Sequence, residues 1–243
     1  MVIKSQEIAS GLYARLNLTD GNSCQIKINT SDWIFPDDQG VDVAVVPFQP
    51  HNDPSPRRYD YNVLSIDMFA TDESLEDYSI GVGDELQIIG LFTHHSGKRR
   101  NNPIVRSGTI AAMPGEPIVD AYGNEFIGYL ACMKSIGGLS GSPVFVVWYP
   151  LFRSFKAGDK DCAVFLLGLV NGHWDYVNNH PDMDLSGEEI KILNSGIAII
   201  TPIQRVHEVT MSVDQRKARR KVDKEIMSSN APTLDVVADK DSD

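Results

Sequence analysis

The chain has 243 residues, 42% of them hydrophobic, which is enough to fill a substantial core and excludes disorder of the whole chain. The formal net charge of −11 excludes nucleic acid as the main partner, because contacts with phosphates need clustered Lys and Arg. The three cysteines, Cys24, Cys132 and Cys162, are far apart in the sequence, so we expect no disulfide scaffold, no metal site and a reducing, cytoplasmic location.

Signals for export or membrane insertion are not recognisable in the sequence. The first residues contain no apolar stretch of the length that a signal peptide needs. No apolar run approaches the roughly 20 residues that cross a bilayer. We therefore expect neither a signal peptide nor a membrane partner.

Residues 12–28 predict a β-hairpin. Apolar and polar residues alternate on both sides of an Asp20-Gly21 turn, which is the pattern of two strands with one buried face. The apolar positions are Leu12, Ala14, Leu16, Leu18, Cys24, Ile26 and Ile28. Residues 41–48 are nearly all apolar or β-branched, so we expect there a strand buried on both faces.

Five further short runs predict strands. They cover residues 86–92, 104–110, 143–149, 163–170 and 196–200. Many short strands separated by Gly, Pro and Asn are typical of all-β sandwiches and barrels rather than of parallel sheets with crossover helices.

The last part of the chain predicts one helix and a tail. Thr201 suits the N-cap, Pro202 the first helical position, and Gln204 a capping box. The basic run at residues 216–221 is either a nucleic-acid or targeting patch or a solvated helix end. The second is favoured, because cations complement the dipole at a helix C-terminus. Residues 228–243 are polar and acidic and are expected to be disordered.

The most informative stretch is Gly137-Gly138-Leu139-Ser140-Gly141-Ser142-Pro143, which runs directly into the apolar residues 144–148. Its glycines permit positive φ, which lets successive backbone N–H groups turn toward one point. Such N–H groups stabilise the oxyanion that forms when a hydroxyl attacks a carbonyl, so Ser140 is a candidate nucleophile. The alternative, a turn serine without chemistry, stays open.

Asp42 is a second candidate residue. It opens an otherwise apolar segment, where a carboxylate is costly unless it is paired or hydrogen-bonded. One interpretation is a group that orients a catalytic base. The other is an Asp that begins a strand and caps its own turn.

Together these segments resemble the trypsin-like (chymotrypsin-fold) serine peptidases, in their simpler bacterial form. The Ser140 turn is similar to their nucleophile loop, and Asp42 in Asp-Val-Ala-Val is similar to the Asp that orients the catalytic histidine. Residues 83–90, 167–173 and 196–198 resemble, in order, the segment that opens the inter-barrel region, the strand that pairs with substrate and the strand beside the specificity pocket. The resemblance covers roughly residues 1–215.

The resemblance implies an all-β fold of two six-stranded antiparallel β-barrels, the first of them incomplete, with a C-terminal helix. Residues 1–80 would form the incomplete first barrel and residues 81–201 the second barrel. Residues 202–227 would form the helix and residues 228–243 the disordered acidic tail.

It also implies a serine endopeptidase that hydrolyses peptide bonds through an acyl-enzyme. Ser140 would attack the peptide carbonyl, Asp42 would orient the base, and the backbone N–H groups of Gly138 and Ser140 would form the oxyanion hole. The residues that would bind a peptide or protein substrate are Lys134, Ser135, Asn171, Gly172, His173 and Gly196. Lys134 would favour an acidic or polar substrate side chain. No cofactor and no metal would be needed.

Two positions depart from the family pattern. Leu139 replaces the Asp that pairs with a new N-terminus after zymogen cleavage, so we expect no activation of that kind. The catalytic histidine precedes the Asp in the family, whereas none of the six histidines here precedes Asp42. Without a general base Ser140 is a weak nucleophile, so we expect little or no peptidase activity from this chain.

Two explanations of the missing histidine stay open. Either the sequence is N-terminally truncated, with the histidine upstream of Met1, or the fold serves as a non-catalytic peptide- or protein-binding module. Truncation is favoured, because a barrel without its opening strands leaves unpaired edges. A third interpretation, an unrelated all-β binding domain, would place Asp42 and Ser140 far apart.

Overall fold

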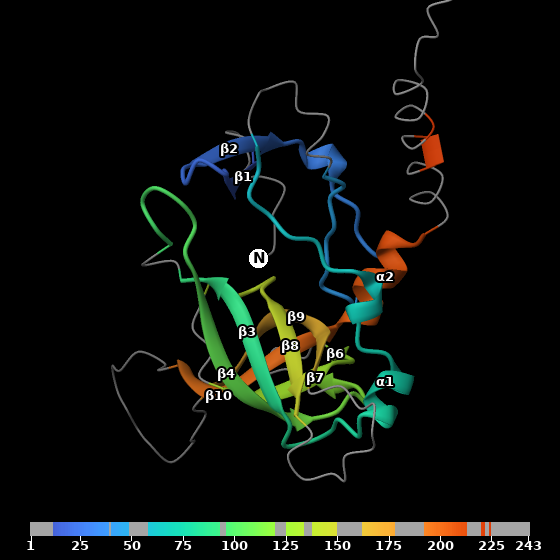
Figure 1. The fold of residues 1–243 in the computed structure, drawn as a ribbon. Helices are drawn as coiled ribbons and strands as arrows, with labels where there is room; N and C mark the ends of the chain where they lie inside the picture. Colours follow the sequence, from blue (N-terminus) through green and yellow to red (C-terminus); the bar gives the residue numbers. More distant parts are fainter. Residues whose placement is uncertain are drawn as a thin grey trace, which may run out of the picture.

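A computed structural model shows a mostly β protein with few helices (Figure 1). It describes residues 12–38, 40–48, 58–92, 96–119, 125–133, 138–149, 162–177, 192–212, 220, 221 and 224. The strands, in chain order, are β1 (Leu12–Asn17), β2 (Ser23–Ile28), β3 (Glu85–Leu91), β4 (Pro103–Ala112), β5 (Ile118–Val119), β6 (Glu125–Phe126), β7 (Tyr129–Cys132), β8 (Pro143–Trp148), β9 (Ala163–Val177) and β10 (Ile192–Pro202). The α-helices are α1 (Asp72–Asp77) and α2 (Ile203–Thr210), and short 3-10 helices cover Thr30–Asp32 and Ile66–Met68. Within the described part of the chain, no helix is long and apolar enough to cross a bilayer.

Six antiparallel strands close into a barrel in the order β10-β7-β4-β3-β8-β9 (Figure 1). Successive side chains of each strand point alternately into the barrel and out of it. In β3, Leu86 and Ile88 are 0% and 1% exposed inside the barrel, while Ile89 is 37% exposed on the outside. One cluster of buried side chains, to which all six strands contribute, fills the interior. A mostly β chain with a closed six-stranded antiparallel barrel is therefore confirmed.

The predicted strands of the barrel correspond to β3, β4, β8, β9 and β10, although β9 and β10 run well beyond their predicted ends. The sequence does not predict β7, because this strand has only four residues and none of them is β-branched. It nevertheless completes the barrel between β4 and β10, where Tyr129 and Ala131 are 1% and 0% exposed.

The predicted hairpin at residues 12–28 is confirmed in its pairing, but its apolar face is only partly buried. β1 and β2 pair antiparallel, with Leu12 opposite Ile28 and Leu16 opposite Cys24, so the apolar positions share one face. The connecting turn closes with a hydrogen bond from the Gly21 N–H to the Leu18 carbonyl.

The structure shows one barrel, and a first barrel ahead of it stays a prediction. Before β3, the described residues pair only in the two-stranded β1–β2 sheet and in isolated bridges such as Ile34–Val45. Residues 41–48 gain that single bridge and form no strand, and Phe48 is 45% exposed. The prediction of a strand buried on both faces is therefore wrong at this segment, because no strand of the described residues pairs with it.

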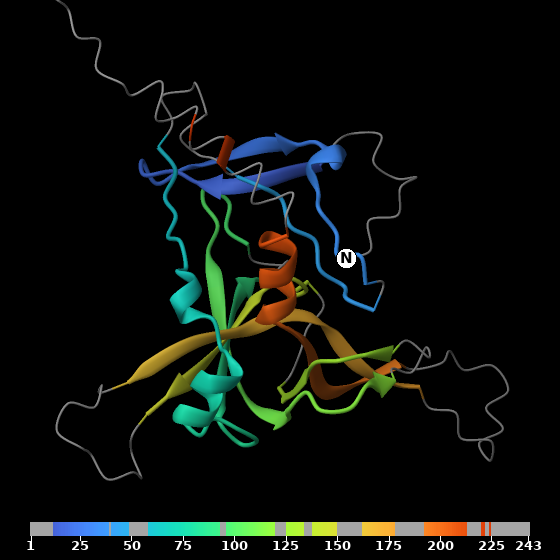
Figure 2. The same cartoon turned by 90° about the vertical axis from the view of Figure 1, so that its right-hand side faces the viewer.

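The β1–β2 hairpin lies across one end of the barrel, against the loop that joins β3 to β4 (Figure 2). Arg15 of β1 reaches the loop, where its two terminal nitrogens donate to the backbone oxygens of Gly97 (2.7 Å) and Lys98 (2.9 Å). One charged side chain thus satisfies two loop carbonyls, and such charge-assisted hydrogen bonds are stronger than neutral ones.

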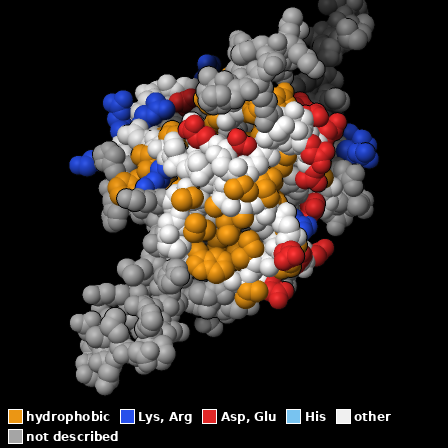
Figure 3. Space-filling model, turned by 90° about the horizontal axis from the view of Figure 1, so that it is seen from below, with side chains coloured by type: hydrophobic (Ala, Val, Ile, Leu, Met, Phe, Trp, Pro, Cys, Tyr) orange, Lys and Arg blue, Asp and Glu red, His pale blue; other side chains and the backbone are white. Residues whose placement is uncertain are grey.

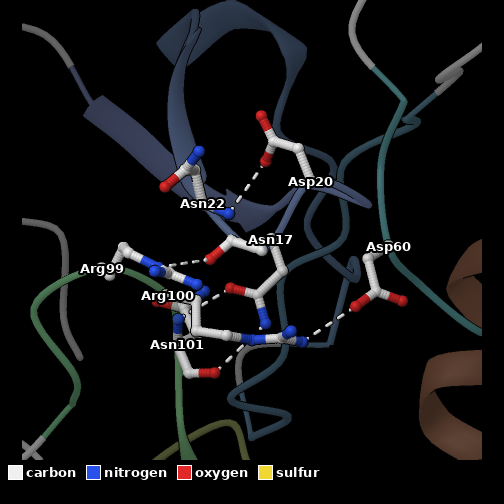
Figure 4. Close-up of polar contacts among 8 residues, drawn as sticks. Asn17, Asp20, Asn22, Asp60, Arg99, Arg100 and Asn101 are labelled. Atoms are coloured by element: carbon white, nitrogen blue, oxygen red, sulfur yellow. Dashed lines mark hydrogen bonds and ion pairs between the residues drawn. The ribbon is translucent and has the colours of Figure 1, made fainter.

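Asparagine side chains extend this contact between hairpin and loop (Figure 4). Asn17 Oδ1 accepts from the Asn101 N–H (2.7 Å), and Asn17 Nδ2 donates to the Asn101 carbonyl (3.1 Å). Asn101 Nδ2 donates in turn to the Arg15 carbonyl (2.8 Å). An ion pair between Arg100 and Asp60 at 2.8 Å lies beside them (Figure 4). The hairpin is therefore held to the loop between β3 and β4 by polar contacts of Arg15 and Asn17 with residues at least 82 positions away in the sequence.

The opposite end of the barrel is closed by aromatic packing next to α1. A reciprocal capping box between Thr71 and Ser74 starts this helix. Tyr78 follows it and packs edge-on against Trp148 of β8 and Phe165 of β9, at ring-centroid distances of 5.1 and 4.9 Å. From below, Figure 3 shows hydrophobic side chains in the middle of this face and acidic side chains along one edge.

α2 covers the outside of the barrel, with Ile203 2% exposed. The predicted N-cap is wrong: Thr201 is still in β10, opposite Leu169, and Pro202 takes the N-cap position without a side-chain hydrogen bond. Gln204 makes no capping box, because its Nε2 donates to the Ala70 carbonyl (2.7 Å). α2 ends at Thr210, and residues 220, 221 and 224 are again helical.

Replacing Asn17 by alanine is expected to loosen the hairpin while leaving the barrel intact. The change removes two hydrogen bonds and leaves the Asn101 backbone groups without these partners, which costs about 1–3 kcal/mol. Amide hydrogen exchange over residues 12–28 should then accelerate about tenfold or more, with exchange in β3–β10 unchanged. Asn102→Ala, an exposed asparagine in the same loop, is the matched control, and equal acceleration in both variants would contradict this role of Asn17.

Burial raises the pKa of Tyr129 from 10.0 to about 12, with a smaller effect from the Asp72 carboxylate. Between these values the unfolded chain loses the phenol proton before the folded chain does. The stability contribution of the neutral phenol is therefore complete below about pH 10 and is lost as the pH rises to about 12, by about 2–3 kcal/mol. Urea unfolding of the native chain and of Tyr129→Phe from pH 8 to 12 checks this, since the variant should lose less stability over that window.

Candidate functional site

The Ser140 turn is a tight connection at the start of β8. Gly138 and Gly141 have φ of 99° and 82°, in the left-handed region that glycine adopts without strain. Inside the turn the Ser142 N–H donates to the Leu139 carbonyl (2.9 Å). The glycines predicted from sequence thus provide the chain reversal that places Ser140 at its tip.

Two backbone hydrogen bonds join this turn to β9. The Gly141 N–H donates to the Val170 carbonyl (2.7 Å), and the Val170 N–H donates to the Ser142 carbonyl (2.9 Å). Leu139, 3% exposed, anchors the turn on its inner side. It lies over Gly90 of β3, where a Cβ atom would come within 2.8 Å of Leu139 Cδ2. Sequence reasoning missed Gly90, although a glycine inside a strand signals close approach of another group.

Ser140 itself is exposed, and its hydroxyl donates to the backbone carbonyl of Asn171 (2.7 Å). Gly138 is exposed as well. Within the described part of the chain, the backbone N–H groups of Gly138 and Ser140 make no hydrogen bond. The two donors that the sequence assigns to an oxyanion hole are therefore available to a ligand.

The predicted substrate-binding residues of β9 and β10 lie beside the turn. Gly172 is opposite Ile199 and His173 is opposite Ala198, and the β9–β10 register shifts next to Asn171. A Cβ atom at Gly172 would meet nothing within 4 Å, so there is open space at this point.

Gly196 lies on β10, with φ of 79°, and its carbonyl accepts from the Met133 N–H (2.7 Å). The structure thus joins the Ser140 turn to Asn171 on β9, with Gly172 and His173 next along that strand, and shows no hydrogen bond between Gly196 and Ser140.

Asp42 makes no hydrogen bond or ion pair with this group in the described structure. It is exposed, and it makes no hydrogen bond or ion pair with any described residue. Its segment is bridged to Ile34 rather than paired with a barrel strand. The structure joins Ser140 to Asn171 by a hydrogen bond and shows no such bond from Asp42 to either residue, so the role of Asp42 stays a prediction. Lys134 and Ser135 lie outside the described residues.

Two of the six histidines, His173 and His207, fall within the described residues. His207 belongs to α2 and packs edge-on against Phe69 at 5.9 Å, on the outside of the barrel. His173 belongs to the predicted substrate strand. Neither is the hydrogen-bond partner of the Ser140 hydroxyl, which is the Asn171 carbonyl. Among the described residues, no group of three or more His, Cys, Asp or Glu is arranged to hold a metal ion.

Comparison of the chain with protein-family models, with curated proteins and with solved structures finds no match. The resemblance to the trypsin-like family therefore rests on the sequence motifs, and the barrel is the part of the expected fold that the structure shows.

Substitutions of three glycines should separate backbone strain from steric overlap at the turn. Gly141→Ala should lower the free energy of unfolding by about 1–2 kcal/mol, because alanine is strained at this φ even though the space is open. Gly90→Ala should cost at least as much, because its Cβ would overlap Leu139 and Ser142. Gly81→Ala has open space and no left-handed φ, so it should change stability by less than about 0.5 kcal/mol. Urea denaturation measures all three, and an equal effect at all positions would contradict the geometry of the turn.

Proposed function

We propose that this chain carries a serine-hydrolase site of the trypsin-like type, in which Ser140 attacks the carbonyl of a peptide. The observation that supports it is the turn before β8. It combines an exposed hydroxyl at Ser140 with two backbone N–H groups, of Gly138 and Ser140, that have no partner among the described residues. Donors fixed in advance by the backbone stabilise a developing oxyanion at little cost of reorganisation.

The reaction would proceed through an acyl-enzyme. Ser140 Oγ would bond to the carbonyl carbon while its proton passes to a general base. The base would then protonate the leaving amine as the carbon–nitrogen bond breaks, and water would release the acyl group by the same two steps in reverse. In the family this base is a histidine oriented by the Asp that Asp42 resembles. The Ser140 hydroxyl donates to a backbone carbonyl and not to a described histidine, so the proposal includes little or no hydrolysis by this chain alone.

A peptide substrate would lie along β9 and β10. An extended peptide can add to a strand through backbone hydrogen bonds, with side chains entering the adjacent space. The open space at Gly172 supports this placement. We also keep the reducing, cytoplasmic location as a proposal, since Cys24, Cys132 and Cys162 are all unpaired.

A non-catalytic peptide-binding module on the same barrel is the second candidate. The hydrogen bond from Ser140 Oγ to the Asn171 carbonyl favours it, because a backbone carbonyl cannot accept the proton that a nucleophile must lose. Binding along β9 would need neither a base nor Asp42.

Labelling with a fluorophosphonate, with and without free imidazole as an external base, separates the two candidates. For a serine-hydrolase site we expect slow labelling by the chain alone and faster labelling when imidazole supplies the missing general base. Ser140→Ala should abolish both, while Ser195→Ala, which removes a different serine of β10, should leave both unchanged.

The outcomes are distinct. Labelling that persists in Ser140→Ala would rule out Ser140 as the nucleophile. Absence of labelling even with imidazole, in a chain that still binds peptides, would favour the binding module. Fast labelling without imidazole would show that a base is already present and would contradict the expected inactivity.

A further inference from the structure

Arg106 of β4 is a cation in an unusual place. It pairs with Ile88 of β3, and paired residues of an antiparallel sheet direct their side chains to the same face. Ile88 is 1% exposed and belongs to the barrel interior, so the Arg106 side chain also leaves its strand on the inner face. The side chain is half-buried, and it makes no hydrogen bond or ion pair within the described chain.

The position of Arg106 is close to the Ser140 turn. Two residues further along β3, Gly90 lies beneath Leu139 and Ser142 of that turn, on the same inner face as Ile88. Two residues of a strand span about 7 Å, and paired Cα atoms lie about 5 Å apart. A long arginine side chain can cross such a distance toward the mouth of the barrel while its stem stays on apolar surface.

Ser142 adds a second unpaired donor at this mouth. Its backbone groups are bonded, to Leu139 and Val170, but its hydroxyl makes no hydrogen bond within the described residues, although Ser142 is only 9% exposed. Arg106 and Ser142 therefore lie on the same inner face, on β4 and directly before β8 with β3 between them, and two residues apart in register. Neither the Ser142 hydroxyl nor an Arg106 nitrogen is among the buried polar atoms without a partner, so both donors reach solvent and can bind an acceptor from outside.

We propose that Arg106 and Ser142 bind a carboxylate of a peptide ligand, on the side of Ser140 that faces β3 and β4. This rests on the proposed function in one respect, that the ligand is a peptide lying over the Ser140 turn. β8 has β9 on one side and β3 on the other. A peptide that pairs with β9 and passes over Ser140 would extend its other half toward Arg106.

The chemistry of the two donors selects the ligand group. A guanidinium offers parallel N–H groups that match the two oxygens of a carboxylate, and a hydroxyl can donate to either oxygen. Amides match this set less well because they carry no charge. The carboxylate can belong to an Asp or Glu side chain or to the end of a peptide, and the experiment distinguishes these sources.

The test is equilibrium binding of labelled hexapeptides to the full chain, read by fluorescence anisotropy. One series carries a single Glu, moved through every position of an N-acetylated, C-amidated peptide, and a second series carries Gln instead. A third peptide has no acidic side chain but keeps a free C-terminal carboxylate. We expect about tenfold tighter binding of the best Glu peptide, or of the free-carboxylate peptide, than of its uncharged counterpart.

Arg106→Gln should reduce that ratio to about one, Arg106→Lys should retain part of it, and Ser142→Ala should lower it several-fold. Arg205→Gln is the matched control, because Arg205 is an arginine of α2 paired with Glu208 at 3.0 Å, and it should leave the ratio unchanged. Circular dichroism melting of each variant shows whether it folds.

Equal binding of the charged and uncharged peptides by the native chain would overturn the proposal without any variant. An unchanged ratio in a folded Arg106→Gln variant would overturn it too. Because no bond is cleaved in this assay, a positive ratio together with failed fluorophosphonate labelling would reject the hydrolase and keep the carboxylate site.

Discussion

The pair of backbone hydrogen bonds between the Ser140 turn and Val170 is the contact on which the site depends. One runs from Gly141 to Val170 and the other from Val170 to Ser142. They fix the register at which β8 enters the barrel beside β9, and the same register brings the Ser140 hydroxyl to the Asn171 carbonyl. The β8–β9 register that closes the barrel therefore also sets the position of the Ser140 hydroxyl. Any change that shifts β8 against β9 would move Ser140 by the same amount.

Apolar packing replaces charge in holding this turn. Leu139 is almost completely buried over Gly90, and burying such a side chain is worth about 1.5–3 kcal/mol. In the family that the sequence resembles, an Asp at this position forms an ion pair only after cleavage. A leucine needs no such event, because its contact forms as soon as the barrel does. This packing agrees with the expectation from sequence that the turn needs no activation by cleavage.

The sequence predicted those parts of the fold whose signals are local. The β1–β2 hairpin and five barrel strands follow from alternation and turn residues that lie within each segment. Strand β7 was not predicted, because its four residues give too short a pattern. Its place in the barrel is set by pairing with β4 and β10 on either side. Thr201 was assigned wrongly to a helix N-cap for a related reason. Pairing with Leu169 keeps it in β10 against its own preference for a helix cap. Residues 41–48 are the opposite case, a strand that was predicted and does not form. Their apolar composition alone cannot supply the partner strands that a sheet needs.

The site divides along the same line. Gly138, Ser140 and Gly141 lie within four consecutive residues, so their turn could be predicted from sequence. The position of Arg106 could not be predicted, because only the pairing of β4 with β3 and of β3 with β8 brings it toward Ser142.

The proposed carboxylate site also raises the question of how an acidic chain could select an acidic ligand. The net charge of −11 repels a carboxylate at long range, but salt screens such fields beyond about 8 Å at physiological ionic strength. Inside that distance the guanidinium of Arg106 has no carboxylate of the described chain within ion-pair range, so its attraction for the ligand decides the selection. The net charge of the chain would then slow association with an acidic peptide at low salt, without setting the preference for acidic over uncharged peptides.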